Sequence, residues 1–305
     1  MRAASRRYAG ELFLVLSALT FSFEWYFIRV LANNGFSTFD IVFGRAFGSL
    51  LIMACCLPFF YTRIVSSKEK IKKNFIFILV LGGIAMLSNT LYNLALQLTT
   101  VANTQIILYL CVFWGILFGS LFLNEKSSTR KIVYTGIAFL GICVAILKND
   151  AGIAISLGIG ELLALAVSFL LSMDAIISRK IRQVSIFARM LLIYAVMALL
   201  TFVIIFYTHS IAYFYNFLSY PFVVYSLALA ATSGILGKGL TYLGINYVPA
   251  SIALVLMLLE PIAQMMTAYL IADEKLSFLS MAGIFIVFAM VFLISKKKTE
   301  VVASV

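Results

Sequence analysis

The sequence predicts an all-α integral membrane protein whose ten transmembrane helices form two inverted repeats of five helices each. Its composition is the first observation: the 305 residues are 63% hydrophobic and only 11% charged, whereas soluble domains are roughly 45–50% apolar and 25% charged. The second is a series of apolar runs separated by short polar breaks. The third is an internal repeat that divides the chain into residues 1–150 and 151–305. Together they exclude a soluble protein of two domains.

The apolar runs give the predicted helices directly, because about 20 mostly apolar residues cross a bilayer as a helix. The breaks between them are short and polar, and none is long enough to hold a folded domain outside the membrane. The predicted spans are 11–31, 40–60, 75–96, 101–123, 130–147, 156–178, 187–206, 222–246, 250–271 and 278–295.

The repeat is clearest between the first and the sixth predicted spans. A shift of 150 positions brings Glu24 onto Asp174, and a shift of 149 brings "NEKSS" at 124–128 onto "DEKLS" at 273–277. Because five is an odd number, the second copy enters the membrane from the opposite side, so the repeats are inverted. Inverted repeats are typical of alternating-access transporters, whose substrate sites lie near the midplane between the two halves.

Basic residues predict how the chain is oriented in the membrane. Of the 23 lysines and arginines, 18 fall in the set of alternate connections that includes both termini. Positively charged connections remain on the cytoplasmic side. We therefore expect a multi-pass protein of the plasma (inner) membrane with both termini in the cytoplasm.

Several segments resemble one family of transporters. They are "FGRAFGSLL" in the second span, "LFLNEKSS" after the fourth, and "LLEPIAQMMTAYLIADEKLS" in and after the ninth. This pattern is similar to the drug/metabolite transporter superfamily, in its EamA branch, over about residues 10–295. The resemblance implies a cavity lined by helices one to four and six to nine, with helices five and ten outside it. Glu24 departs from the family pattern, which usually has a small or polar residue at that position.

Ionisable residues inside the spans are the main candidates for a site, because burying a charge at the bilayer centre costs about 2.5–3.5 kcal/mol on insertion scales. Glu24 follows Ser17 and Thr20 at helical spacing, which predicts a polar stripe facing a wet cavity. It could bind a cationic group, carry a proton, or pair with Arg45. Arg45 is expected to form a gating or structural ion pair, whereas Arg189 is expected at the cytoplasmic end of its span, near lipid phosphates.

The second half supplies three further charged candidates. Lys238 stands among glycines and is expected to contact substrate or to act in gating. Asp174 lies in the inner third of its span, where it could pair with Lys238 or Arg179. Glu260 precedes Pro261, and a proline disturbs the preceding helical turn. Glu260 is therefore expected to face the cavity and bind substrate or a proton, the alternative being a buried acid bonded to polar neighbours.

Uncharged polar and aromatic side chains complete the predicted substrate site. Asn89 is the repeat counterpart of Lys238 in the third span. Aromatic faces beside a carboxylate suit an ammonium group, which makes Trp25, Tyr92 and Tyr242 candidates, although packing is the usual role of any single aromatic residue.

Other classes of protein lack the residues that they need. The four cysteines have no metal-ligand spacing, and the single histidine, His209, lies in a connection, so we expect no metal, no cofactor and no intramembrane enzyme. The basic residues form no stripe, which argues against nucleic acid. A channel usually needs rings of groups from an oligomer.

The expected function is therefore transport of a small metabolite across the lipid bilayer, with an amino acid or a related ammonium-bearing solute as the expected substrate. Protons are a possible coupling ion, and exchange is another possible mode. A hydrophobic cation or drug is the alternative substrate, which Lys238 disfavours. Gly115 and Gly119 form a GxxxG pattern that leaves open a monomer or a homodimer.

Overall fold

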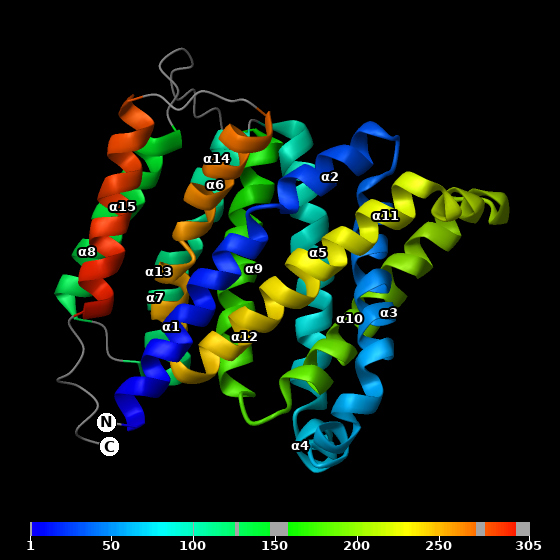
Figure 1. Cartoon of the computed structure of the whole chain (residues 1–305), viewed down its shortest axis with the longest axis horizontal. Helices are drawn as coiled ribbons and strands as arrows, with labels where there is room; N and C mark the ends of the chain where they lie inside the picture. Colours follow the sequence, from blue (N-terminus) through cyan, green and yellow to red (C-terminus); the bar gives the residue numbers. More distant parts are fainter. Residues whose placement is uncertain (1, 100, 126–127, 147–157, 273–277, 297–305) are drawn as a thin grey trace.

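The computed structural model describes residues 2–99, 101–125, 128–146, 158–272 and 278–296, and the regular elements in these ranges are helices (Figure 1). The first half of the chain forms α1 (Arg2–Phe21), α2 (Glu24–Asn33), α3 (Thr38–Val65), α4 (Lys68–Lys73), α5 (Phe75–Leu98), α6 (Val101–Leu108), α7 (Cys111–Leu123) and α8 (Thr129–Ile146). The second half forms α9 (Ile159–Lys180), α10 (Ile186–Thr208), η1 (Ile211–Leu218), α11 (Tyr220–Leu229), η2 (Ala230–Gly237), α12 (Lys238–Tyr247), α13 (Ala250–Leu256), α14 (Leu259–Ala272) and α15 (Phe278–Lys296).

Eight helical segments within the described ranges are long and apolar enough to cross a membrane. Some of these segments consist of two consecutive helices; Tyr8–Asn33, for example, runs over α1 and α2. The apolar parts of α8 and α15, Ile132–Val144 and Met281–Ile294, are shorter than these eight segments. These ten segments coincide with the ten predicted spans, but only eight reach the length of a span. The "DEKLS" motif at 273–277 lies outside the described residues, as do the adjoining ends of the fifth and sixth predicted spans.

The helices pack in pairs that join the two halves of the chain. In the central part α5 lies against α9, α1 against α12, and α3 against α10. Helices α8 and α15 lie side by side at one edge of the molecule, away from this central group (Figure 1). The N-terminal end of α1 and the C-terminal end of α15 lie at the same side of the molecule (Figure 1).

The first predicted span is not one continuous helix. A turn at Ser22 and Phe23 separates α1 from α2, so Glu24 becomes the first residue of α2 instead of a mid-helix residue. The Thr267 hydroxyl from α14 donates to the Ser22 carbonyl at 3.0 Å and stabilises the break. The segment has no glycine or proline at this point, so only a contact distant in sequence marks the interruption.

The fourth and ninth predicted spans are interrupted at corresponding positions, at residues 109–110 and 257–258. Pro261 lies in the first turn of α14, where its missing N–H costs no helical hydrogen bond, and the prediction that it disturbs the preceding turn is confirmed. Directly after the break at 109–110, the Ser172 hydroxyl of α9 donates to the Cys111 carbonyl at 2.6 Å. This contact ties the start of α7 to α9.

The eighth predicted span contains a π-helical segment, η2, directly before Lys238. Segments of this kind loosen the regular hydrogen-bond ladder and are frequent at functional sites. The Tyr194 hydroxyl donates to the Gly234 carbonyl at 2.6 Å, and the Ser17 hydroxyl donates to the Gly237 carbonyl at 2.8 Å. These two contacts hold the irregular backbone between α10 and α1 and fix the position of Lys238.

The Gly115–Gly119 pair packs inside the same chain. A Cβ atom at Gly115 would lie 2.1 Å from the Leu254 side chain, and one at Gly119 would lie 3.6 Å from Ser251. These glycines therefore allow α7 to approach α13, and the intramolecular contact explains the GxxxG pattern without a dimer.

The 3-10 helix η1 is attached to the start of α3. Ser37 and Asp40 form a capping box there, and the Tyr213 hydroxyl donates to Asp40 Oδ2 at 2.6 Å. Burial and the hydrogen bond to the Asp40 carboxylate raise the pKa of Tyr213 to about 12. The hydrogen bond from Tyr213 to Asp40 holds η1 against the start of α3.

We expect adjacent glycines of α5 to respond oppositely to alanine. A Cβ at Gly82 would lie 2.6 Å from Val196 Cβ in α10, whereas a Cβ at Gly83 meets no atom within 4 Å. Gly82→Ala should lower the stability by about 1–3 kcal/mol through overpacking, and Gly83→Ala should be neutral or slightly stabilising. Thermal unfolding in detergent measures both, and equal melting temperatures for the two variants would contradict the packing of α5 on α10.

Candidate functional site

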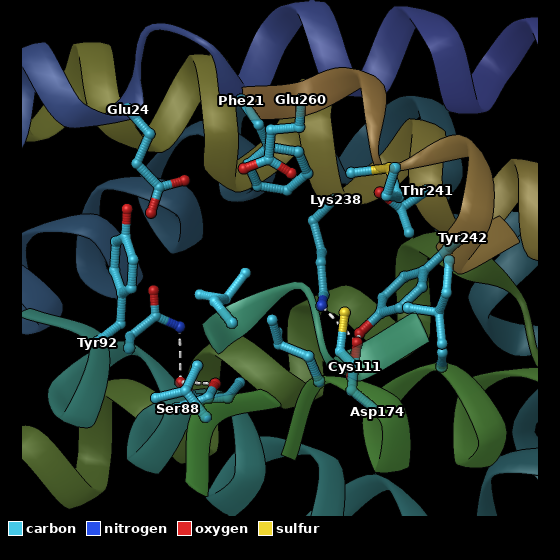
Figure 2. A pocket seen from close by; sticks show the side chains of 18 of the residues that line it. Phe21, Glu24, Ser88, Tyr92, Cys111, Asp174, Lys238, Thr241, Tyr242 and Glu260 are labelled. Atoms are coloured by element: carbon cyan, nitrogen blue, oxygen red, sulfur yellow. Dashed lines mark hydrogen bonds and ion pairs between the residues drawn. The ribbon is translucent and has the colours of Figure 1, made fainter. Parts of the chain in front are cut away.

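A cavity of about 160 Å³ lies between the two halves of the chain, measured as the space open to the centre of a water molecule (Figure 2). One water needs about 10–15 Å³ by the same measure, so a small solute has room. Its described lining residues come from the central helices and none from α8 or α15, as the family resemblance implied. Eight of the predicted site residues line it: Glu24, Arg45, Asn89, Tyr92, Asp174, Lys238, Tyr242 and Glu260.

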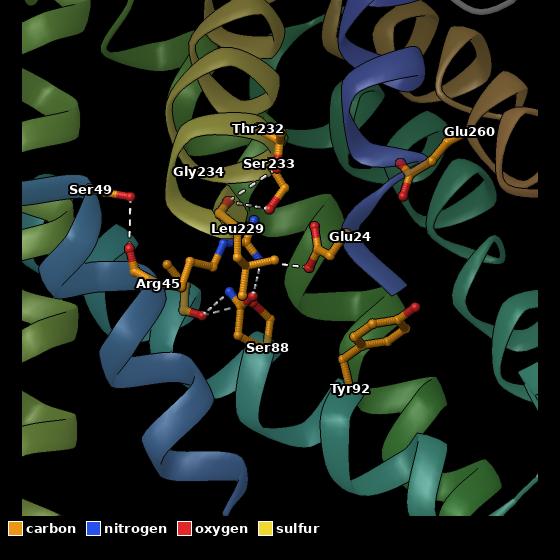
Figure 3. A network of polar contacts seen from close by, with 12 residues as sticks. Glu24, Arg45, Ser49, Ser88, Tyr92, Leu229, Thr232, Ser233, Gly234 and Glu260 are labelled. Atoms are coloured by element: carbon orange, nitrogen blue, oxygen red, sulfur yellow. Dashed lines mark hydrogen bonds and ion pairs between the residues drawn. The ribbon is translucent and has the colours of Figure 1, made fainter. Parts of the chain in front are cut away.

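On one side of the cavity, Arg45 joins three helices. Its Nη1 atom lies 2.6 Å from Glu24 Oε1 at the start of α2 and 2.6 Å from Asn89 Oδ1 in α5 (Figure 3). The side chains of Arg45 and Glu24 are only 8% and 12% exposed. The pair that the sequence left open is therefore present, and the Glu24 carboxylate has a cation as its direct partner.

On the opposite side, Lys238 and Asp174 form a second buried ion pair (Figure 2). Lys238 Nζ lies 2.5 Å from Asp174 Oδ2, and the Tyr242 hydroxyl donates to Asp174 Oδ1 at 3.3 Å. Of the two partners considered for Asp174, the structure selects Lys238. Arg179 instead donates to the Ile245 carbonyl near the end of α12.

Glu260 has no cationic partner within the part of the chain that the structure describes. Its Oε1 atom accepts a hydrogen bond from Gln264 Nε2, one turn along α14, at 3.2 Å. Figure 2 places its carboxylate beside the cavity, between Glu24 and the Lys238 side chain. Glu260 is therefore the cavity acid available to a positively charged solute.

The remaining walls are mostly apolar or aromatic. Tyr92 accepts a hydrogen bond from Gln105 Nε2 at 2.9 Å and lies near Glu24 (Figure 3). Apolar side chains close the cavity between the charged groups, among them Leu171, Ile193 and Met257. A solute with a compact apolar part and charged ends would match this lining.

Two sequence predictions about the first span are wrong. Trp25 does not line the described cavity; its indole nitrogen donates to Thr267 Oγ1 at 3.2 Å and ties α2 to α14. Ser17 and Thr20 do not continue a cavity stripe to Glu24 either, because the turn at 22–23 changes the direction of the helix. Ser17 instead contacts η2 and α12, and Thr20 donates to the Ser17 carbonyl.

The prediction for Arg189 is also wrong. Instead of reaching lipid phosphates, Arg189 is fully buried. Its guanidinium carbon lies 4.0 Å from the centre of the Tyr242 ring, and Nη1 donates to the Ser178 carbonyl at 2.8 Å. Its place near the end of a span made it look like an interfacial residue, although its helix packs inward at that point.

The sequence reasoning missed two glutamines of the cavity, Gln105 and Gln264. Gln264 and Thr267 follow Glu260 at spacings of four and seven residues, a polar stripe that would have indicated this face of α14. Gln105 stands alone among apolar residues and carries no such signal.

The cavity therefore has two electrostatically different regions. At the Lys238 end, Lys238 pairs with the Asp174 carboxylate, and a second cation, Arg189, lies behind the lining on the Tyr242 ring. On the other side Arg45 and Glu24 balance each other, and Glu260 adds a carboxylate. No group of metal-binding side chains occurs among the described residues. The arrangement can hold a solute that carries both a positive and a negative group.

Comparison with known proteins gives one family and one fold. The model of the EamA-like transporter family matches residues 8–147 and again residues 158–296. A solved structure titled "Crystal structure of protein" is similar with a TM-score of 0.77 and 15% identity, over 95% of this chain and 97% of that chain. At that identity the likeness concerns the fold alone. No curated protein matches the sequence.

Removal of Arg45 should be more damaging than removal of the whole ion pair. Arg45→Met leaves the Glu24 carboxylate buried without its cation, which costs about 3–5 kcal/mol. In the double variant Arg45→Met and Glu24→Gln, most of that loss should be recovered, because neither member of this ion pair leaves an unpaired charge. The test is a thermal-unfolding cycle of the single and double variants, and strictly additive losses would contradict the coupling.

Proposed function

We propose, since the chain belongs to the EamA-like transporter family, that it is a secondary transporter that moves a small zwitterionic metabolite, of the amino-acid class, by alternating access. The family suggests a membrane transporter. The observation that carries the substrate class is the pairing pattern of the charges: among the described residues Glu260 pairs with no cation, whereas Lys238 pairs with Asp174 and Arg189, next to Tyr242, pairs with no carboxylate.

The proposal includes inverted repeats of five helices, residues 1–150 and 151–305. Corresponding helices of the two halves make corresponding contacts, which supports the repeat. In one set of contacts, α5 and α7 of the first half lie against α9. In the matching set, α12 and α14 of the second half lie against α1. The breaks at 109–110 and 257–258 occupy corresponding places in the two halves. Ten spans would place both termini in the cytoplasm, at the plasma (inner) membrane, where most basic connections also lie.

In this mechanism the substrate ammonium binds Glu260, and the substrate carboxylate binds Lys238. The apolar walls between these residues contact the rest of the solute. Each of the two ion pairs joins two helices within one half of the chain: Arg45–Glu24 joins α3 to α2, and Lys238–Asp174 joins α12 to α9. Rocking of one half against the other would then expose the same site to each side in turn.

A carrier differs from a channel or an enzyme in one direct measurement. Purified protein is reconstituted in liposomes loaded with a mixture of unlabelled amino acids, and uptake of the labelled mixture is followed. An unlabelled internal pool should accelerate entry of the label, because exchange avoids return of the empty carrier. Uptake that is indifferent to the internal pool, or no uptake at all, would contradict an amino-acid carrier.

Neutralisation of Glu260 should weaken substrate binding without disturbing the fold. Loss of a charge-assisted hydrogen bond costs roughly 1.5–3 kcal/mol, so Glu260→Gln should raise the half-saturating amino-acid concentration in the counterflow assay about 10- to 100-fold. The control is Glu69→Gln, the same change at an exposed acid of α4. Unchanged half-saturation in Glu260→Gln would remove Glu260 from the substrate site.

We also propose that Glu260 carries the coupling proton, since Glu24 already has a cation partner. Amino acids added outside should then drive protons across the membrane of liposomes that contain a pH-sensitive dye. Glu260→Gln should abolish this substrate-driven flux, and Glu24→Gln should retain it. Flux that persists unchanged in Glu260→Gln would show that coupling, if present, uses another group.

A further inference from the structure

Arg189 is a buried cation whose hydrogen-bonding capacity is largely unused. It is 0% exposed, and within the described residues its Nε and Nη2 atoms have no hydrogen-bond partner. Only Nη1 donates, to the Ser178 carbonyl at 2.8 Å. Buried donors are almost always satisfied, so two free nitrogens on a buried guanidinium need an explanation beyond packing.

Arg189 packs on the same aromatic ring, that of Tyr242, as Lys238 of the cavity ion pair. Ser178 follows Asp174 by four residues on α9, and such positions are neighbours one turn apart on the same helix face. The Tyr242 ring stands between the two cations, with the Arg189 guanidinium carbon at 4.0 Å and Lys238 Nζ at 5.2 Å from its centre. The Asp174 charge also acts on Arg189. Asp174 therefore has a second cation in its surroundings, next to the Tyr242 ring.

The proposed substrate creates a charge problem that this second cation solves. A substrate carboxylate that binds Lys238 must compete with Asp174, whose Oδ2 atom lies 2.5 Å from Nζ. If Lys238 turned to the substrate, Asp174 would keep only the Tyr242 hydroxyl at 3.3 Å. A carboxylate left unpaired in such a buried place is strongly destabilising.

We propose that Arg189 is a reserve counterion for Asp174. When the carboxylate of a bound zwitterion takes Lys238, Asp174 shifts towards the free Nε and Nη2 atoms of Arg189 and stays paired. Arg189 is thus a positioning residue that makes Lys238 available to an anionic group. This inference rests on the proposed function, because it assumes a substrate that carries a carboxylate.

The test is a mutant cycle on the protein without substrate, so it does not depend on whether transport of amino acids is found. Lys238→Met and Arg189→Met each leave Asp174 one cation. The double variant leaves none, so its melting temperature should fall about 5 °C further than the sum of the two single losses. In an Asp174→Asn background the same changes should be additive. In the Lys238→Met background, Arg189→Lys, which keeps the charge, should avoid much of the additional loss that Arg189→Met causes.

Infrared difference spectra, with Asp174→Asn as the reference, report whether the Asp174 carboxyl is protonated. A purely structural role of Arg189 would not change that protonation state. The Asp174 carboxyl should stay ionised in Lys238→Met and become protonated in the double variant. If the double variant does not fold, recovery of a folded triple variant with Asp174→Asn supports the inference, and a triple variant that also fails overturns it. Two other results overturn the inference. One is additive losses with Asp174 present as well as in the Asp174→Asn background, and the other is a protonated Asp174 in the single variant Lys238→Met.

Discussion

The cost of placing charges away from water is the constraint on which the cavity depends. Each buried ionisable group needs a partner, and the helices are arranged so that most have one: Glu24 has Arg45, and Asp174 has Lys238. Glu260 accepts a hydrogen bond from the Gln264 amide and interacts with Tyr109, but in the described structure it pairs with no cation. Among the described residues, Glu260 pairs with no cation and Arg189 pairs with no carboxylate. A solute with one ammonium and one carboxylate group would balance these two charges.

The broken helices belong to the same constraint. Turns at 22–23, 109–110 and 257–258 let backbone and side chains meet inside the membrane, and the π-helical segment η2 does so in the eighth span. Their exposed carbonyls accept hydrogen bonds from Thr267, Ser172, Tyr194 and Ser17. These hydroxyls come from helices distant in sequence, so local irregularity and tertiary packing stabilise each other.

The positions of the spans follow from the sequence because bilayer thickness fixes the length of an apolar run. The repeat likewise brings Glu24 and Asp174, or Asn89 and Lys238, to the cavity from matching positions. The turn at Ser22–Phe23 could not be predicted, since it depends on Thr267 and not on a local glycine or proline. For the same reason Trp25 was misplaced. Arg189 was misjudged because burial of one helix end depends on which neighbours cover it, which periodicity does not record.

The central claim is that the cavity selects a solute with both charges, and three probes with one apolar side chain test it most directly. They are L-leucine, 3-methylbutylamine, which lacks the carboxylate, and 4-methylpentanoate, which lacks the ammonium. A ligand stabilises the folded protein in proportion to its occupancy. The account predicts that at equal concentration L-leucine raises the melting temperature of the purified protein more than either single-charge analogue. An equal or larger shift with 3-methylbutylamine would contradict it, because Lys238 and Arg189 would then play no part in recognition.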